Sequence, residues 1–131
     1  MNKDIAIIYE NILEFHKALE DSDDYPIYSG IREAGLIKSA VNAPFATIFG
    51  EDAFPTLFDK AARLGFGLAK NHGFEDGNKR TALHAMITLL GINGIEINYN
   101  QDEIQDLICD VAESKISVED LSAWLKQRAI Y

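Results

Sequence analysis

The sequence predicts an all-α protein, a compact helical bundle with one short β element. Apolar residues recur every three or four positions along most of the chain, which is the period of a helix packed by one face. Residues typical of helix ends, such as Asn, Ser, Gly and Pro, stand between these periodic stretches. With 131 residues, 47% apolar content and no repeat or linker, residues 1–131 are expected to form a single domain.

Two helices are predicted before residue 45. Apolar side chains at three- and four-residue spacing over residues 5–19 predict an opening helix, which the acidic run before Pro26 ends. A shorter helix is predicted over residues 31–41. Pro44 stops this second helix, because proline has no N–H group to donate.

A short β-prone segment and a third helix are predicted next. Residues 45–50 carry aromatic and β-branched side chains and end in a glycine turn, a pattern that favours a strand over a helix. The following periodic stretch predicts a helix over residues 54–70. Gly65 and Gly67 lie inside it, and their lack of a side chain would let a neighbouring helix approach closely.

The second half of the chain contains a loop followed by three more predicted helices. Residues 71–77 have the composition of a loop, and Asn78 is predicted to cap a strongly apolar helix after it. Residues 100–114 form the next predicted helix, with Asn100 as its cap. Ser117 is predicted to open the last helix, which turns its apolar residues towards the core.

Composition and charge disfavour several classes of function. The formal net charge of −9 disfavours a general nucleic-acid binder, because phosphate backbones repel an acidic surface. No apolar run approaches the roughly 20 residues of a membrane span, and the N-terminus does not resemble a signal peptide. The single cysteine, Cys109, is predicted to be a buried, inert thiol. These features predict a soluble, cytoplasmic protein that binds neither a membrane nor, directly, a nucleic acid.

The residues that carry chemistry lie between His72 and Arg80. His72 is the side chain best suited to accept a proton near neutral pH, and Asp76 offers a hard oxygen ligand for Mg²⁺ shared with phosphates. Gly77 lets the backbone turn sharply before a helix N-terminus, where unpaired N–H groups attract anions. Lys79 and Arg80 add positive charge at the helix end that cations normally avoid. Phosphoryl or nucleotidyl transfer requires such a combination of base, metal ligand and anion site.

Each residue of this stretch also has a purely structural interpretation, and only their joint spacing favours chemistry. A single loop histidine is commonly a capping or solvated group, Gly77 would serve only the turn, and Asn78 only the helix cap. Phe74 is predicted to anchor the loop in the core. The other histidines, His16 and His84, are interpreted as structural, with a place in the pocket wall as the alternative for His84.

The string His72-x-Phe74-x-Asp76-Gly77-Asn78-Lys79-Arg80 resembles the signature of the Fic/Doc superfamily, in its death-on-curing branch. The resemblance extends over roughly residues 30–125 and includes the segments 31–40 and 57–71. It implies a compact Fic-like helical bundle, with a short β-hairpin flap beside the motif loop.

The resemblance implies a role for each matching residue. His72 would be the general base for a target hydroxyl, and Asp76 would hold Mg²⁺ on the phosphates of ATP. The phosphates themselves would be bound by Gly77, Asn78, Lys79 and Arg80. The flap, which would align the target by β-strand addition, would consist of Phe45, Ala46, Thr47, Ile48 and Phe49. The alternative for these five residues is a buried connector between helices.

Two positions distinguish the branches of the superfamily. AMP-transferring Fic enzymes have glycine where this chain has Lys79, and a second arginine where it has Leu83. The resemblance therefore implies a kinase-like toxin that transfers the γ-phosphate of ATP to a threonine or serine hydroxyl of elongation factor Tu and arrests translation. AMP transfer to a protein hydroxyl is the alternative. A non-catalytic binding module and a nucleic-acid-binding regulator are the alternatives from other classes.

The resemblance further implies a protein partner. Members of this branch usually come with a small antitoxin, whose C-terminal segment folds onto the toxin near the active site. No antitoxin portion is recognised in this sequence. Restraint by a separate, cognate antitoxin is therefore predicted, in a type II toxin–antitoxin system.

Overall fold

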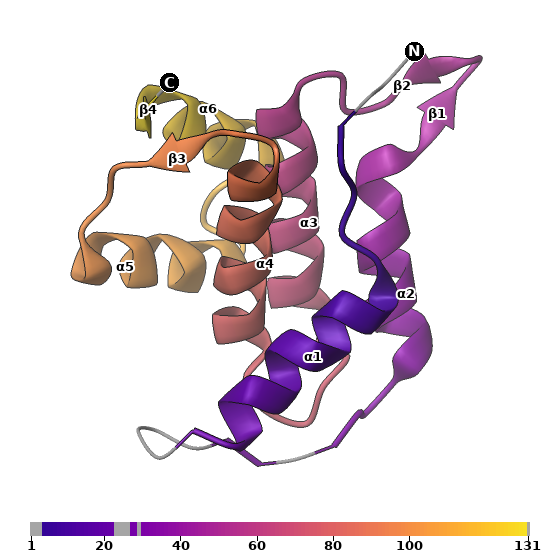
Figure 1. Cartoon of the computed structure of the whole chain (residues 1–131), viewed down its shortest axis with the longest axis vertical. Helices are drawn as coiled ribbons and strands as arrows, with labels where there is room; N and C mark the ends of the chain where they lie inside the picture. The colour runs from indigo at the N-terminus through magenta and orange to yellow at the C-terminus, as the bar shows by residue number, and fades with distance from the viewer. Residues whose placement is uncertain (1–3, 23–26, 29, 131) are drawn as a thin grey trace.

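The computed structural model describes residues 4–22, 27–28 and 30–130, and most of these are helical (Figure 1). Within these ranges, no helix combines the length and the apolar character needed to cross a membrane. The predicted all-α bundle with a small hairpin is confirmed. The helices, in chain order, are α1 (Tyr9–Glu20), α2 (Ala34–Asn42), the 3-10 turn η1 (Ala43–Phe45), α3 (Leu57–Asn71), α4 (Asn78–Ile92), α5 (Gln101–Ala112) and α6 (Val118–Gln127).

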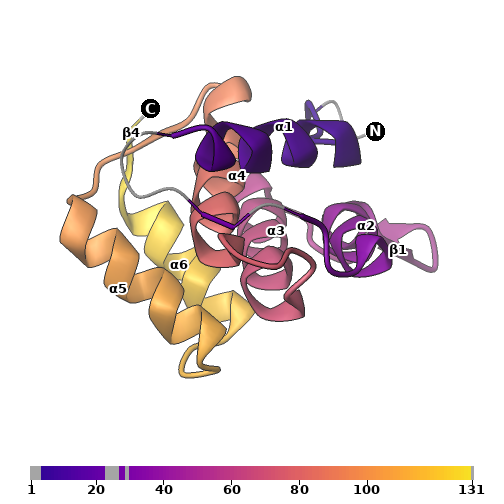
Figure 2. The same cartoon turned by 90° about the horizontal axis from the view of Figure 1, so that it is seen from below.

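Helices α3 and α4 form the centre of the bundle. Figure 2 shows α5 and α6 on one side of this pair, α2 on the other and α1 beside α4. A Cβ atom placed on Gly65 would lie 2.9 Å from the Met86 sulfur, and one on Gly67 would lie 3.0 Å from the Cβ of Ala40. The prediction that these glycines permit close helix packing is confirmed, because any side chain there would push α3 away from α4 or α2.

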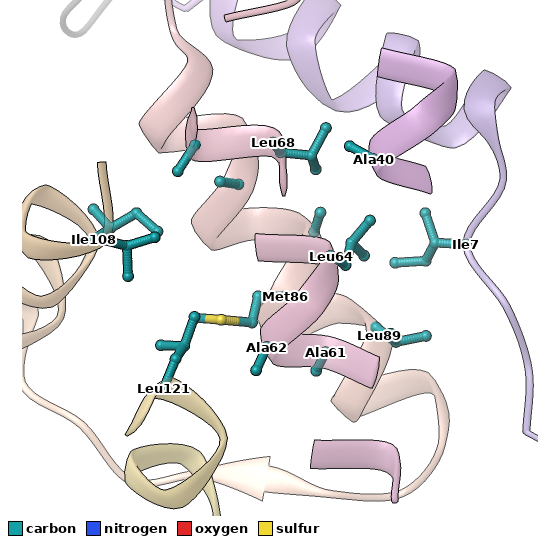
Figure 3. Close-up of a cluster of buried hydrophobic side chains, with 14 of the residues drawn as sticks. Ile7, Ala40, Ala61, Ala62, Leu64, Leu68, Met86, Leu89, Ile108 and Leu121 are labelled. Carbon is teal, nitrogen blue, oxygen red and sulfur yellow. The ribbon is translucent and has the colours of Figure 1, made fainter. Parts of the chain in front are cut away.

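The core is built around the two central helices (Figure 3). Met86 of α4 is fully buried, with Ile108 of α5 and Leu121 of α6 on one side. Ile7 and Ala40 close the cluster on the other side. Side chains on both sides of α3 and α4 pack these two helices firmly against each other. The loop that joins them is therefore held at both ends by well-packed helices.

Helix α1 begins at Tyr9, so the predicted start at residue 5 is wrong. Residues 5–8 precede the helix, and Ile7 is buried while its neighbour Ile8 is exposed. The cause lies at the far end of α4. The Asn93 side chain accepts the N–H of Ile5 at 2.7 Å and donates to its carbonyl oxygen at 2.9 Å, which holds this residue outside the helix. Pro26, predicted to follow this helix, lies outside the described residues.

The predicted helix caps are confirmed in two helices out of three. The side chains of Asn100 and Ser117 each accept a backbone N–H in the first turn of α5 and α6, at 2.9 and 3.0 Å. Asn78, the predicted cap of α4, is instead the first residue of that helix. Gly77 occupies the cap position with φ of 77°, and no described side chain caps the start of α4, a helix end that attracts anions.

Helices α2 and α3 also begin later than predicted. Ile31 lies before α2 because it forms an isolated antiparallel bridge with Phe74. Helix α3 begins after Thr56, whose hydroxyl accepts the N–H of Asp59 at 3.0 Å in a capping box.

Apart from the bridge of Ile31, the β structure of the described residues consists of two antiparallel pairs with two residues in each strand. The first is the hairpin of β1 (Thr47–Ile48) and β2 (Glu51–Asp52). The second joins β3 (Glu96–Ile97) to β4 (Ala129–Ile130), and the sequence analysis did not predict it. Strands this short carry almost no pattern, so their pairing depends on the packing of the helices around them.

The hairpin lies at the opposite end of α3 from the loop that leads into α4 (Figure 1). Helix α3 has 15 residues, so its ends are about 22 Å apart. The structure therefore does not bring residues 45–49 beside the motif loop, where the flap was expected. They are not a buried connector either, because β1 is exposed, Phe49 at the tip is fully exposed, and only Phe45 packs on the core as part of η1.

Lys60 anchors this hairpin to the bundle. Its side chain is completely buried in α3, and its ammonium group donates to Asp52 of β2 at 3.1 Å and to the carbonyl oxygen of Phe54. A buried ammonium group without partners would be strongly destabilising. The two acceptors therefore fix the base of the hairpin on the first turn of α3.

Candidate active site

The loop between α3 and α4 is bounded by two residues in the left-handed conformation. His72 ends α3 with φ of 53° and ψ of 46°, and Gly77 starts α4 with φ of 77°. For glycine this conformation is unstrained, whereas a histidine adopts it only at some cost in energy. The two left-handed residues thus turn the chain at both ends of the loop.

The predicted catalytic and binding residues line one polar pocket of about 360 Å³. His72, Asp76 and residues 77–80 form most of its wall, with Ile27 and Glu75 beside them. Among the described residues, none forms a hydrogen bond with the imidazole of His72, and the side chain is exposed. The structure thus brings the predicted base, metal ligand and phosphate-binding residues together, and leaves the imidazole accessible to a substrate.

Backbone N–H groups fix the orientation of the Asp76 carboxylate. Gly77 donates to Oδ1 at 2.8 Å and Tyr28 donates to Oδ2 at 3.0 Å. A carboxylate offers about four acceptor positions, so both oxygens retain a lone pair for a cation. Mg²⁺ is commonly bound by one or two carboxylates together with substrate phosphates and water. The half-buried Asp76 carboxylate, which precedes the N-terminus of α4, fits that pattern.

Asn78 stabilises the loop through the backbone of Phe74. The Asn78 side chain accepts the Phe74 N–H and donates to the Phe74 carbonyl oxygen, both at 3.0 Å. Phe74 itself is buried, which confirms its predicted role as the anchor of the loop. The predicted contact of Asn78 with a phosphate would use the remaining N–H of its side-chain amide.

Lys79 and Arg80 supply positive charge in the first turn of α4. Both side chains are exposed and line the polar pocket as well as a neighbouring groove. The Lys79 ammonium lies 3.9 Å from the sulfur of Cys109 in α5. Cys109 was predicted to be buried, but it is only partly buried. A hydrogen bond from Lys115 lowers the pKa of the Glu113 carboxyl, and the charge of Lys79 acts in the same direction.

The segment before α2 pairs with the loop, a contact that sequence reasoning missed. The Gly73 carbonyl oxygen accepts the N–H groups of Arg32 and Glu33, both at 2.9 Å. The Gly30 carbonyl oxygen accepts the N–H of Glu75 at 3.1 Å. The extended chain that lies against the loop is therefore the segment before α2 and not the hairpin. No local pattern in the sequence marks this pairing, because the two segments are distant in the chain.

An apolar groove of about 520 Å³ adjoins the polar pocket between α4 and α5. Leu83, Ile87, Ile104 and Ile108 form its apolar wall, and Lys79 and Arg80 stand at its edge. His84 also lines it, with its ring packed edge-on against Phe15 at 4.4 Å between centroids. His84 is exposed and lines this groove, but it does not line the polar pocket of the motif.

The match to a known protein family covers the loop, all of α3 and most of α4. The family model described as Fic/DOC family matches residues 6–90. Toxin Doc of Mycolicibacterium smegmatis is 43% identical over 97 residues, which are 72% of this chain and 75% of that protein. Protein kinase doc of Escherichia phage P1 is 27% identical over 118 residues, which are 90% of each chain.

Proposed function

The chain belongs to the Fic/DOC family, and on this basis we propose that it is the toxin of a toxin–antitoxin pair and acts as a protein kinase. The proposed reaction transfers the γ-phosphate of ATP to a threonine or serine hydroxyl of elongation factor Tu, which would arrest translation. The names of the two relatives, a toxin and a protein kinase, support this class of activity. The observation that carries the proposal is the single pocket shared by His72, Asp76 and the first turn of α4.

Each residue of the pocket has a proposed role in this reaction. The oxygen of the target hydroxyl forms a bond to the γ-phosphorus while the bond to the bridging oxygen of ADP breaks, and the imidazole of His72 takes the hydroxyl proton. Asp76 would hold Mg²⁺, which supplies charge neutralisation on the phosphates. Backbone N–H groups after Gly77, with Lys79 and Arg80, would bind the phosphates at the start of α4.

The distribution of charge along α4 supports γ-phosphate transfer over AMP transfer. The basic residues Lys79 and Arg80 are confined to the first turn of the helix. One turn later Leu83 lines the apolar groove, at the position where AMP-transferring relatives carry a second arginine. The anion site is thus short, and Lys79 occupies space that a glycine would leave open to the phosphate chain.

Parallel labelling of ATP tests this proposal directly. Purified protein and elongation factor Tu are incubated with Mg²⁺ and ATP that carries label at the α- or the γ-phosphate. We expect label to reach the target only from the γ-position, since the bond broken lies between the γ-phosphorus and ADP. Reactions without the target measure self-labelling and serve as the control.

The other outcomes of this assay each identify a different function. Transfer of label from the α-position would show that the protein is an AMP transferase. It would contradict the interpretation that Lys79, in place of glycine, favours γ-phosphate transfer. No transfer from either position, combined with stable binding of the target, would favour a non-catalytic binding module. Transfer from γ-labelled ATP to other proteins of a whole lysate would retain the kinase and replace the proposed target.

The apolar groove is the proposed docking site of the cognate antitoxin. Its wall between α4 and α5 is apolar, and Lys79 and Arg80 lie at the edge that it shares with the polar pocket. An amphipathic helix with an acidic side chain near these two residues would match both features. An antitoxin segment held there would lie next to the bound phosphates, which explains how it could block the reaction.

A charge placed in the groove should weaken antitoxin binding. We expect Leu83→Glu to lower the affinity for the antitoxin's C-terminal segment on the order of 10²-fold, because the new carboxylate loses its hydration on binding. Isothermal titration calorimetry measures this change. Ile92→Glu is the matched control, since Ile92 is an exposed residue of the same helix outside the groove. Equal affinities of the two variants would place the antitoxin elsewhere.

A further inference from the structure

His16 is a buried histidine of α1 that contacts the active-site loop. Only 3% of its surface is exposed. Its Nε2 lies 2.8 Å from the carbonyl oxygen of Asp76, which is 60 residues away in the chain. A carbonyl oxygen only accepts hydrogen bonds, so Nε2 carries the hydrogen and donates it to Asp76.

Further contacts hold this ring in one orientation. The imidazole stacks on the ring of Phe74, with centroids 3.8 Å apart and planes inclined by 5°. Its Nδ1 faces a carboxylate oxygen of Glu20 at 3.9 Å. The other carboxylate oxygen of Glu20 accepts the N–H of Gly30 at 3.2 Å. His16 therefore lies at the point where α1, the segment before α2 and the active-site loop meet.

The bond to the Asp76 carbonyl controls the peptide group that follows it. A trans peptide is planar, so its C=O and N–H bonds point in opposite directions. Because His16 draws the Asp76 carbonyl towards α1, the N–H of Gly77 points away from α1 and reaches Oδ1 of Asp76 at 2.8 Å. The same peptide thus links the His16 ring on one side to the Asp76 carboxylate on the other.

We propose that His16 is a positioning residue for the active site, which fixes the Asp76–Gly77 peptide and, through it, the Asp76 carboxylate. His16 itself lines neither the polar pocket nor the groove. The importance of the carboxylate for transfer rests on the function proposed above, whereas the control of the peptide group rests on geometry alone.

Amide hydrogen exchange in the protein without nucleotide tests this inference independently of activity. His16→Phe retains an aromatic ring to stack on Phe74 but removes the donor, whereas His16→Gln restores an N–H donor at similar reach. We expect the Gly77 amide to exchange about tenfold faster in His16→Phe and close to the original rate in His16→Gln. Ile12→Val is the matched control, since it alters a buried position of the same helix one turn earlier.

Two results would overturn the inference. The first is an unchanged Gly77 exchange rate in His16→Phe, and the second is an equal acceleration in Ile12→Val, which would reveal only general loosening of α1. In the transfer assay, we expect the Mg²⁺ concentration for half-maximal rate to rise about tenfold in His16→Phe, as for residues that orient a metal ligand. If no transfer activity is found, the exchange experiment still decides the role of His16.

Discussion

Replacement of His72 should reduce phosphate transfer by about 10² to 10⁴-fold, or roughly 3 to 5 kcal/mol of barrier, because it removes the proposed general base. Growth arrest on expression should disappear together with transfer. The fold should remain intact, since the ring is exposed and no described residue forms a hydrogen bond with it. Rates of transfer to elongation factor Tu and thermal unfolding curves measure the two effects separately.

The choice of substituent separates loss of the base from strain in the backbone. His72 has φ of 53°, and alanine would add a cost in this conformation, whereas asparagine tolerates it comparatively well. We therefore expect His72→Asn to unfold close to the original temperature and to be as inactive as His72→Ala. A His72→Asn variant that keeps more than about a tenth of the original rate would contradict the role of general base.

The helices are largely predictable because the signals that form them are local. Asn100 and Ser117 begin their helices through bonds to N–H groups three residues later, so the sequence alone indicates both starts. The prediction of where α1 starts is wrong because the signal that sets this start is not local. Its first apolar residues match a helical stripe, but Asn93, 88 residues away, holds Ile5 outside the helix. Long-range bonds of this kind leave no periodic trace in the sequence.

The chemical groups of the site are more predictable than their surroundings. His72 and Asp76 lie in one short loop, so their proximity follows from the sequence itself. What lies against the loop depends on tertiary packing. The hairpin was expected there, but it adjoins the N-terminus of α3 while His72 follows the C-terminus, and the length of this helix separates them. The segment before α2 takes that place through backbone bonds such as Arg32 to Gly73.

The role of His16 is likewise hidden in the sequence. It lies one helical turn before Glu20, near the polar edge of the stripe of α1, and this position predicts no more than a structural residue. Its partner, the Asp76 backbone, contributes a carbonyl oxygen that every residue type would provide. A side chain that binds backbone cannot be inferred from the identity of its partner.

Gly77→Ala should abolish most activity by disturbing the peptide that connects the loop to α4. Gly77 has φ of 77°, and an alanine there is strained by about 1 to 2 kcal/mol. Its Cβ would also lie 2.5 Å from the Cδ1 of Ile27, so that side chain or the loop must move. A displacement of about 1 Å among the groups that position a substrate can lower the rate about 10²-fold. We expect a loss of this size in transfer to the target.

Gly94→Ala separates the effect on the site from simple backbone strain. Gly94 follows α4 with φ of 88°, and no atom lies within 4 Å of the Cβ that alanine would add. The left-handed conformation should therefore lower the free energy of unfolding of both variants by about 1 to 2 kcal/mol, measured in urea. In Gly77→Ala, the contact with Ile27 should lower it further. Only Gly77→Ala should lose transfer, because only it lies between the Asp76 carboxylate and the first N–H groups of α4. Equal transfer rates in the two variants would mean that the turn at Gly77 serves folding alone, and that the phosphates bind away from the start of α4.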